Sequence, residues 1–288
     1  MNIQGKTVLI TGASRGIGRA IALEFAHQGV QRLLLVARNR AQLERVATQI
    51  EALGIEAVVI PLDLTCLPEV SVAIAQAWRD YGPIHVLVNC AGVAHQESFL
   101  QSHLPNVQSE INTNLMGMYA VTRQVARRMV ARQEGTIVNV SSLMGKIAAP
   151  TMATYSATKF AIVGFTQALR SELIGRRVKV MALLPSLTET DMTQELQPFR
   201  WMIRMTPQQV AKALMTGLER DSPEITVGWQ AHLAVLAHRL APRVVEWFVY
   251  LASPSFNAFA QMRQRLQGLK QLLFKWWRPL LWRSQSSL

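Results

Sequence analysis

The chain has 288 residues, of which half are hydrophobic and 17% are charged, and its formal net charge is +12. This composition excludes an intrinsically disordered chain, which combines low hydrophobicity with high charge, and the length fits one large α/β domain or two small ones. Because no stretch reaches the ~18 consecutive apolar residues of a spanning helix and the N-terminus lacks a basic start followed by an apolar segment, we expect neither a transmembrane protein nor a secreted one.

Short apolar runs alternate along the chain with longer segments of helical periodicity. The predicted strands cover residues 7–11, 32–37, 57–61, 85–89, 135–140, 178–184 and 224–227. The predicted helices cover residues 16–28, 40–53, 67–81, a long stretch that ends near 132, and 154–174. Uninterrupted apolar strands are typical of a parallel sheet that is covered on both faces. The alternation therefore predicts an α/β fold with a doubly wound parallel sheet of about seven strands.

The first predicted strand runs into a glycine-rich turn at residues 11–18, directly before the first helix. Glycines allow a tight turn and a close approach of the backbone to a phosphate, and the helix N-terminus offers N–H groups to the anion. The alternative is a turn that is glycine-rich for packing reasons alone. We predict that the turn binds a dinucleotide through Gly12, Ser14, Arg15, Gly16, Ile17 and Gly18.

The end of the second predicted strand indicates which dinucleotide is bound. NAD-dependent enzymes of this architecture carry an acidic residue here for the ribose 2′-hydroxyl, whereas this chain has Ala37 and then Arg38. Arg38 and Arg15 together would hold a 2′-phosphate. The alternative is a solvated arginine at a helix start, although a cation is unfavourable near a helix N-terminus. The sequence therefore predicts NADP(H) rather than NAD(H).

Tyr155 and Lys159 are four residues apart at the start of a predicted helix, so both side chains project from one face. A tyrosine has an ordinary pKa of about 10 and is a poor proton donor or acceptor at neutral pH. A neighbouring ammonium stabilises the phenolate and lowers that pKa. The pair predicts acid–base chemistry, but the same spacing is common by chance, so its meaning depends on the rest of the chain.

Six motifs follow one another along the chain: TGASRGIG at 11–18, Asp63-Leu64, NCAG at 89–92, NTN at 112–114, paired serines at 141–142, and YSATK at 155–159. In these motifs, over about residues 5–228, the chain resembles the short-chain dehydrogenase/reductase family. The resemblance implies a Rossmann-like sheet and an NADP-preferring oxidoreductase. The chain departs from the family pattern at Pro185-Ser186, where the family usually has Pro-Gly.

The resemblance implies a role for four catalytic positions. Tyr155 would donate a proton in ketone reduction and accept one in alcohol oxidation, and Lys159 would lower the pKa of Tyr155 and bind the nicotinamide ribose. Ser142 would hold the substrate oxygen; the family usually places this serine thirteen residues before the tyrosine, which favours Ser142 over the neighbouring Ser141. Asn114 would hold a water that relays protons through Lys159.

The resemblance also implies further cofactor contacts near the ends of the strands. These residues are Asp63, Leu64, Asn89, Ala91, Gly92, Pro185, Thr188 and Thr190. No metal is expected, because the six histidines show no ligand spacing. The two cysteines, Cys66 and Cys90, match no metal or redox spacing either, which is typical of a cytoplasmic protein.

Two apolar loops, residues 143–154 and 190–206, are expected to line the substrate side. Methionine-rich apolar walls suit a flexible lipophilic substrate; alternatively, these side chains pack the loops onto the body. We predict NADPH-dependent reduction of a ketone or aldehyde of such a substrate. Two alternatives remain, namely a soluble 3-oxoacyl-carrier reductase and a non-catalytic NADP-binding scaffold at a membrane.

Residues 229–288 form a predicted helical extension of the domain at 1–228, with eight Lys or Arg, one acidic residue and five of the seven tryptophans. Within it, residues 259–280 have the pattern of a basic amphipathic helix with tryptophans at one end. We predict that residues 257–288 contact an anionic membrane surface peripherally, on its cytoplasmic face. Packing on the body and a seam between identical subunits remain as alternatives. Nucleic-acid binding is not expected, because no motif supports it.

Overall fold

The computed structural model describes residues 2–254, in which seven parallel strands form one sheet with the order β3-β2-β1-β4-β5-β6-β7. This arrangement confirms the predicted doubly wound α/β sheet. The strand order reverses between β1 and β4, and ligands of such sheets bind outside the carboxyl ends of the strands at this point. The strands are β1 (Thr7–Thr11), β2 (Arg32–Ala37), β3 (Glu56–Pro61), β4 (Val86–Asn89), β5 (Gly135–Val140), β6 (Val178–Leu184) and β7 (Glu224–Thr226).

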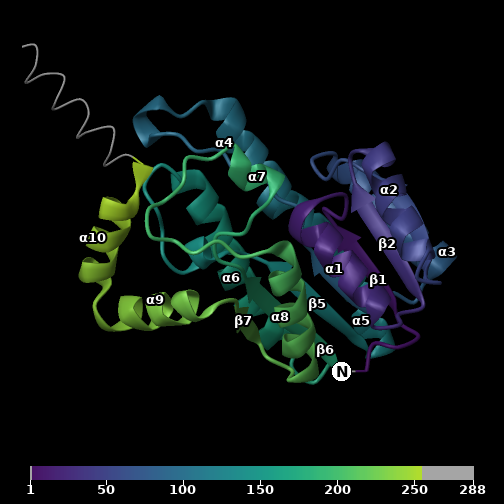
Figure 1. Ribbon diagram of the computed structural model, residues 1–288. Coiled ribbons are helices and arrows are strands. Elements are labelled where there is room, and N and C mark those ends of the chain that lie inside the picture. Colours follow the sequence, from purple (N-terminus) through teal and green to yellow (C-terminus); the bar gives the residue numbers. More distant parts are fainter. Residues whose placement is uncertain (1, 255–288) are drawn as a thin grey trace, which may run out of the picture.

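Helices cover both faces of the sheet (Figure 1). One layer holds α1 (Gly16–His27), α2 (Arg40–Glu51) and α8 (Pro207–Glu219), and the other holds α3 (Leu67–Tyr81), α5 (Met118–Arg132) and α6 (Ala153–Glu172). Each layer closes a separate apolar core against the sheet. Phe25 and Leu214 lie in the first core, and Ile74 and Val125 lie in the second, all without solvent exposure. The central strands β1, β4 and β5 are buried along their whole length and are mostly apolar, because both faces of the sheet are covered.

The long helix predicted to end near residue 132 is wound irregularly. It consists of α4 (Leu104–Glu110), a π-helical segment (Ile111–Gly117) and α5. Single π-helical turns often mark functional sites, because they shift the side chains that follow. Here the π-helical segment includes Asn114, whose side chain is fully buried.

In the described part of the chain, the last strand is followed by α9 (Trp229–Leu240) and α10 (Pro242–Ala252), which we call the arm. Figure 1 shows the arm on the side of the molecule away from α2 and α3. Pro242 begins α10, as expected for a residue without an N–H group. Hydrogen bonds from Arg200 N to Ala252 O (2.9 Å) and from Ile203 N to the Gln230 side chain (3.1 Å) tie the arm to the body.

The boundary predicted after residue 228 stays a prediction, and the basic helix predicted at 259–280 lies outside the described residues. Among the helices of residues 2–254, none combines the length and the apolar character needed to cross a membrane.

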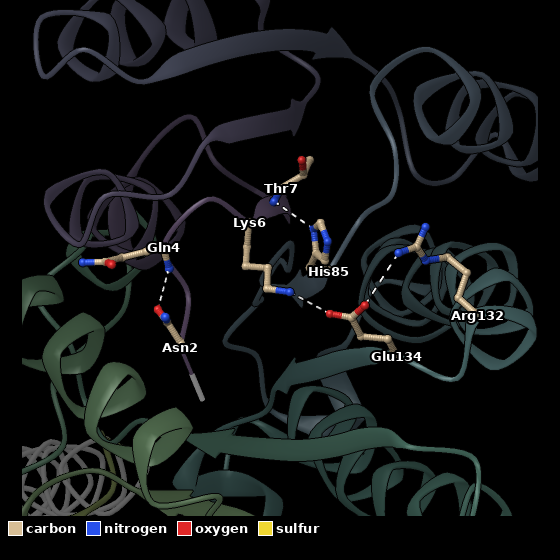
Figure 2. A network of polar contacts seen from close by, with 7 residues as sticks. All are labelled: Asn2, Gln4, Lys6, Thr7, His85, Arg132 and Glu134. Atoms are coloured by element: carbon tan, nitrogen blue, oxygen red, sulfur yellow. Dashed lines mark hydrogen bonds and ion pairs between the residues drawn. The ribbon is translucent and has the colours of Figure 1, made fainter.

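A polar network joins the amino ends of three neighbouring strands (Figure 2). Lys6 donates to Glu134 at 2.7 Å, and Arg132 lies 3.6 Å from the same carboxylate. The backbone N–H of Thr7 donates to Nδ1 of His85 at 3.1 Å. Burial and the charge of Lys6 hold the pKa of His85 below its ordinary value, so the ring is neutral and Nδ1 is free to accept. These contacts connect the amino ends of β1, β4 and β5, at the edge of the sheet opposite the carboxyl ends of the strands.

Candidate active site

The glycine-rich turn between β1 and α1 has no room for side chains at two positions. Gly12 has a φ of +69°, and a Cβ there would lie 2.8 Å from the backbone of Ala91. A Cβ on Gly18 would overlap the carbonyl oxygen of Gly12. The N-cap residue of α1, Arg15, makes no side-chain capping hydrogen bond, so the first N–H groups of the helix remain available to an anion.

A groove with a cavity volume of about 390 Å³ extends from this turn to the start of α6. It gathers the residues that follow β1, β2, β3 and β4, because the carboxyl ends of parallel strands share one edge of the sheet. Most of the predicted cofactor residues line it. They are Gly12, Ser14, Arg15, Gly16, Ile17, Gly18, Arg38, Asp63, Leu64, Ala91, Gly92, Tyr155, Lys159 and Thr190.

Three predicted cofactor residues lie outside this groove. Asn89 is buried, and its amide donates to Thr122 Oγ1 and Asn139 Oδ1, both at 2.8 Å, so it ties β4 to α5 and β5. Pro185 and Thr188 line a second cavity instead. Conversely, the groove is lined by residues that no motif singled out as cofactor contacts, among them Asn39, Gln42 and Asp191.

Two arginines give the groove a positive charge. Arg38 follows β2, and its charge favours the ionised form of Asp63. Burial raises the pKa of the Asp63 carboxyl, but hydrogen bonds from Thr65 and the charge of Arg38 bring this pKa below its ordinary value. Arg15 Nη1 lies 3.5 Å from Asp191 Oδ2, and both side chains are more than half exposed. Such an exposed ion pair contributes little to stability. Both guanidinium groups are therefore available to an anionic ligand.

Tyr155 and Lys159 lie in the first two turns of α6. The hydroxyl of Tyr155 and the amino group of Lys159 are both buried. Lys159 Nζ donates to the carbonyl oxygen of Val140 at 3.1 Å and lies 5.4 Å from the centre of the Tyr155 ring. Burial lowers the pKa of Lys159 to about 8. Burial also raises the pKa of Tyr155 to about 12, although a hydrogen bond with the Ser142 side chain opposes this rise. In this arrangement burial dominates, so the lowering of the Tyr155 pKa by Lys159 stays a prediction.

The two adjacent serines have different surroundings. The hydroxyl of Ser141 is buried and donates to the carbonyl oxygen of Lys159 at 2.8 Å. Ser142 lines the second cavity together with Tyr155, and its Oγ accepts a hydrogen bond from Met144 N at 3.1 Å. The arrangement favours Ser142 as the residue that meets a substrate oxygen, because Ser141 holds β5 to α6.

Asn114 is held in one orientation by hydrogen bonds at both ends of its amide. Oδ1 accepts from Val93 N at 2.8 Å, and Nδ2 donates to Val93 O at 2.9 Å and to Thr158 Oγ1 at 3.2 Å. A Cβ on Gly92 would lie 3.2 Å from Asn114 Oδ1 and 3.6 Å from Lys159 Nζ. Asn114 and Lys159 therefore approach the same point beside Gly92, which suits the predicted proton relay.

A buried acid, Glu110, lies one turn before Asn114 and was not predicted from the sequence. Its side chain is 1% exposed and accepts a hydrogen bond from His95 N at 2.5 Å. Burial raises the pKa of its carboxyl, although the hydrogen bond from His95 opposes the rise. A glutamate in an amphipathic helix ordinarily faces solvent, so no sequence signal marks this one as buried.

A second cavity, of about 540 Å³, lies on the other side of Tyr155 and has a mostly apolar lining. Both loops expected to face substrate contribute to it, through Leu143, Met144, Ile147, Ala149 and Met152 and through Met192, Leu196, Phe199, Trp201 and Met202. The sequence did not predict that the arm supplies the rest of the wall, including Trp229, Leu233, Phe248 and Val249. Tyr155, Ile17 and Met192 line this cavity and the groove alike, so the two spaces meet at the tyrosine.

Within residues 2–254, no cluster of three or more His, Cys, Asp or Glu side chains has the arrangement of a metal site. The predicted catalytic residues Tyr155, Lys159, Ser142 and Asn114 lie together between the glycine-rich turn and the apolar cavity.

Comparison with known proteins shows the family to which the chain belongs. The family model for short chain dehydrogenases matches residues 6–201, about two thirds of the chain. The chain belongs to the short-chain dehydrogenase family. It is 32% identical to the ketoacyl reductase HetN of Nostoc sp. over 259 residues. The aligned region covers 85% of this chain and 90% of that protein. The chain is 34% identical over 194 residues to a 3-oxoacyl-[acyl-carrier-protein] reductase of Synechocystis sp., covering 67% of this chain and 78% of that protein.

Solved structures of other short-chain dehydrogenases share the fold. A short-chain dehydrogenase from Sphingobium yanoikuyae in complex with NADPH superposes with a TM-score of 0.72 at 28% identity, covering 91% of this chain and 95% of that one. A bulky-bulky ketone specific alcohol dehydrogenase from Comamonas testosteroni gives a TM-score of 0.69 at 26% identity, covering 93% of this chain and 95% of that one. Both similarities extend past the catalytic motifs over most of the chain.

Proposed function

We propose that this short-chain dehydrogenase uses NADPH to reduce a ketone or aldehyde of a lipophilic substrate to the alcohol. The observation that carries the proposal is the position of Tyr155, which lines both the phosphate-binding groove and the apolar cavity. A proton donor at the junction of these two spaces meets a carbonyl group on one side and a nicotinamide on the other.

The residues of the groove fit NADP(H). Gly12 and Gly18 let the backbone of the turn pack closely against Ala91 and against itself, and such a tight turn brings the N-terminus of α1 next to a diphosphate. Arg15 and Arg38 supply positive charge for a 2′-phosphate, and the end of β2 carries Ala37 where an acidic residue would favour NAD(H). The NADPH complex of the relative from Sphingobium yanoikuyae supports the same choice.

The chemistry then follows from four side chains. The bound nicotinamide would supply the hydride. Ser142 orients the substrate carbonyl by a hydrogen bond, and the Tyr155 hydroxyl donates the proton to the developing alkoxide. Because burial raises the pKa of Tyr155 to about 12, the phenol carries its proton at neutral pH, and the role proposed for Lys159 is to make that proton easier to give up. Lys159 and Asn114, which meet beside Gly92, return a proton to the tyrosine.

The size and apolar lining of the 540 Å³ cavity support a bulky, lipophilic substrate. The experiment is an NADPH oxidation assay with ketones of increasing apolar size, including 3-oxoacyl thioesters and bulky aromatic ketones. We expect the specificity constant to rise with apolar size, and Tyr155→Phe to lower turnover by roughly 10²–10⁴-fold. The matched control is Tyr119→Phe, because the side chain of Tyr119 on α5 is 48% exposed. Unchanged turnover in Tyr155→Phe would contradict the proposal.

A second candidate is a soluble 3-oxoacyl-carrier reductase, favoured by the names of the curated relatives from Nostoc sp. and Synechocystis sp.. This candidate predicts a strong preference for a carrier-bound thioester over the same acyl group on a small thiol. A non-catalytic scaffold is disfavoured because Asn114, Ser142, Tyr155 and Lys159 are all in place.

The proposal includes a location at the cytoplasmic face of a membrane. It rests on the sequence after Asn257, which has six Lys or Arg and no acidic residue. Such a segment is attracted to anionic lipid. A seam between identical subunits is the competing role for this segment.

A further inference from the structure

The arm exposes large apolar side chains on its outer side. We call the following set the outer face of the arm: Trp229, Leu233, Leu240, Val244, Trp247 and Phe248, which are between 54% and 79% exposed. A surface helix of a soluble domain usually turns its apolar side inward and its polar side to water. Concentrated exposure of this kind marks an interaction surface.

Three of the six residues in the outer face of the arm also belong to the rim of the apolar cavity. Trp229, Leu233 and Phe248 line the cavity and are exposed at 68%, 58% and 54%, respectively. Trp201, from the loop after α7 (Asp191–Gln194), lines the cavity as well and is 67% exposed. Side chains that are both lining and exposed mark where a cavity opens, so the cavity opens through the outer face of the arm.

We propose that the outer face of the arm lies on an anionic lipid bilayer, and that a carbonyl-bearing lipid passes from this bilayer through the mouth of the cavity to Tyr155. This inference rests on the proposed function, because it names the source and class of the substrate for the same site. An entry path of this kind keeps the apolar part of the substrate out of water from the bilayer to the tyrosine.

Aromatic character and charge both favour a bilayer as the occupant. Tryptophan and phenylalanine side chains suit the interface between headgroups and acyl chains. Arg239 and Arg243 flank the break between α9 and α10, and the sequence after Asn257 adds six cations without an acid. A second copy of this chain would bring the like charges of Arg239 and Arg243 together in a two-fold contact, and an acidic carrier protein would leave the apolar side chains without partners.

The first test measures co-flotation of the full-length protein with vesicles of phosphatidylcholine and phosphatidylglycerol, and with vesicles of phosphatidylcholine alone. The test variant is Leu240→Ser combined with Trp247→Ser, because neither side chain lines the cavity. The matched control is Val72→Ser, which is 67% exposed on α3, away from the arm. We expect the double variant to bind anionic vesicles roughly tenfold more weakly or worse, and the control to bind like the wild type.

The second test measures turnover of a long-chain 3-oxoacyl thioester held in the anionic vesicles against a short-chain one in solution. The double variant is expected to lose most of the vesicle activity and to keep the solution activity, because its catalytic residues are untouched. Flotation that is undiminished in the double variant overturns the inference. The inference is also overturned if the wild type does not float but is a dimer, while the double variant is a monomer. In that case the outer face of the arm would be a contact between subunits. If the wild type reduces neither thioester while the flotation results hold, the proposed function fails and the membrane contact stands.

Discussion

The hydroxyl of Ser141 donates a hydrogen bond to the carbonyl oxygen of Lys159 at 2.8 Å. This contact joins the end of β5 to the helix that carries Tyr155 and Lys159. The neighbouring Ser142 lines the apolar cavity with Tyr155, as Ser141 does, but its Oγ accepts from Met144 N within the loop. We therefore propose separate tasks for the two serines, with Ser141 holding the site together and Ser142 meeting the substrate.

Alanine at each serine should separate these tasks. Ser142→Ala removes a donor to the substrate oxygen, so we expect turnover to fall by roughly 10²–10³-fold with little change in Tm. Ser141→Ala removes a buried hydrogen bond, so we expect a loss of about 1 kcal/mol in unfolding free energy and turnover within a few-fold of wild type. Steady-state kinetics and thermal unfolding of both variants check this pair. The reverse pattern would make Ser141 the catalytic serine.

Cofactor preference depends on the charge at the end of β2. Arg38→Asp places a carboxylate beside the expected 2′-phosphate, so we expect NADPH to bind roughly 10–100-fold more weakly, with a much smaller effect on NADH. Arg45→Asp makes the same change of charge at an exposed position of α2 and serves as the control. Dissociation constants from nicotinamide fluorescence check the prediction. An equal loss for both cofactors would show that Arg38 does not recognise the 2′-phosphate.

The sequence predicted those parts of the site that depend on local rules. The apolar runs specify the strands, and Gly18 is required by a backbone contact within the turn itself, whereas Gly12 is required by the approach of Ala91 after β4. Tyr155 and Lys159 fall on one face of α6 because helical periodicity places residues four apart together. The parallel sheet then brings the ends of its strands to one edge, which explains why most of the predicted cofactor residues line one groove.

The remaining features depend on packing between distant segments. The π-helical turn that holds Asn114 changes the winding by one residue, which an apolar pattern does not register. Pro185 and Thr188 face the second cavity because of the path that the chain takes after β6. The apolar helical pattern of residues 229–252 indicated helical structure but not its partner, so the place of the arm in the cavity wall became evident only in the folded chain.

Two glycines offer a matched test of the phosphate-binding turn. Alanine at Gly18 would overlap the carbonyl oxygen of Gly12, so we expect it to cost about 1–3 kcal/mol of unfolding free energy and to weaken NADPH binding. Alanine at Gly164 in α6 meets open space and replaces a poor helix former, so we expect a gain of about 0.5–1 kcal/mol. Chemical denaturation of both variants checks the two signs. A neutral Gly18→Ala would mean that the turn can relax.

The last prediction concerns the buried carboxyl of Glu110. Burial raises its pKa in the folded protein, although the hydrogen bond from His95 N opposes the rise. The folded state therefore holds this proton more tightly than the unfolded state, and stability falls as the pH rises above the unfolded pKa of about 4.3. Glu110→Gln keeps an acceptor for His95 and removes the cost of the buried charge. We expect its Tm to exceed that of the wild type by roughly 2–4 °C at pH 8 and the difference to vanish near pH 4.

Glu97 provides a control of opposite sign. Hydrogen bonds from the backbone and side chain of His103 hold the pKa of Glu97 below its ordinary value. Its ionised form therefore contributes stability at pH values above the unfolded pKa, and this contribution is lost as the pH falls. Glu97→Gln should lower the Tm at pH 8 and have little effect in acid. Thermal unfolding of both variants between pH 4 and pH 8 compares the two slopes, and parallel slopes for Glu110→Gln and the wild type would show that Glu110 is not ionised in the folded protein over this range.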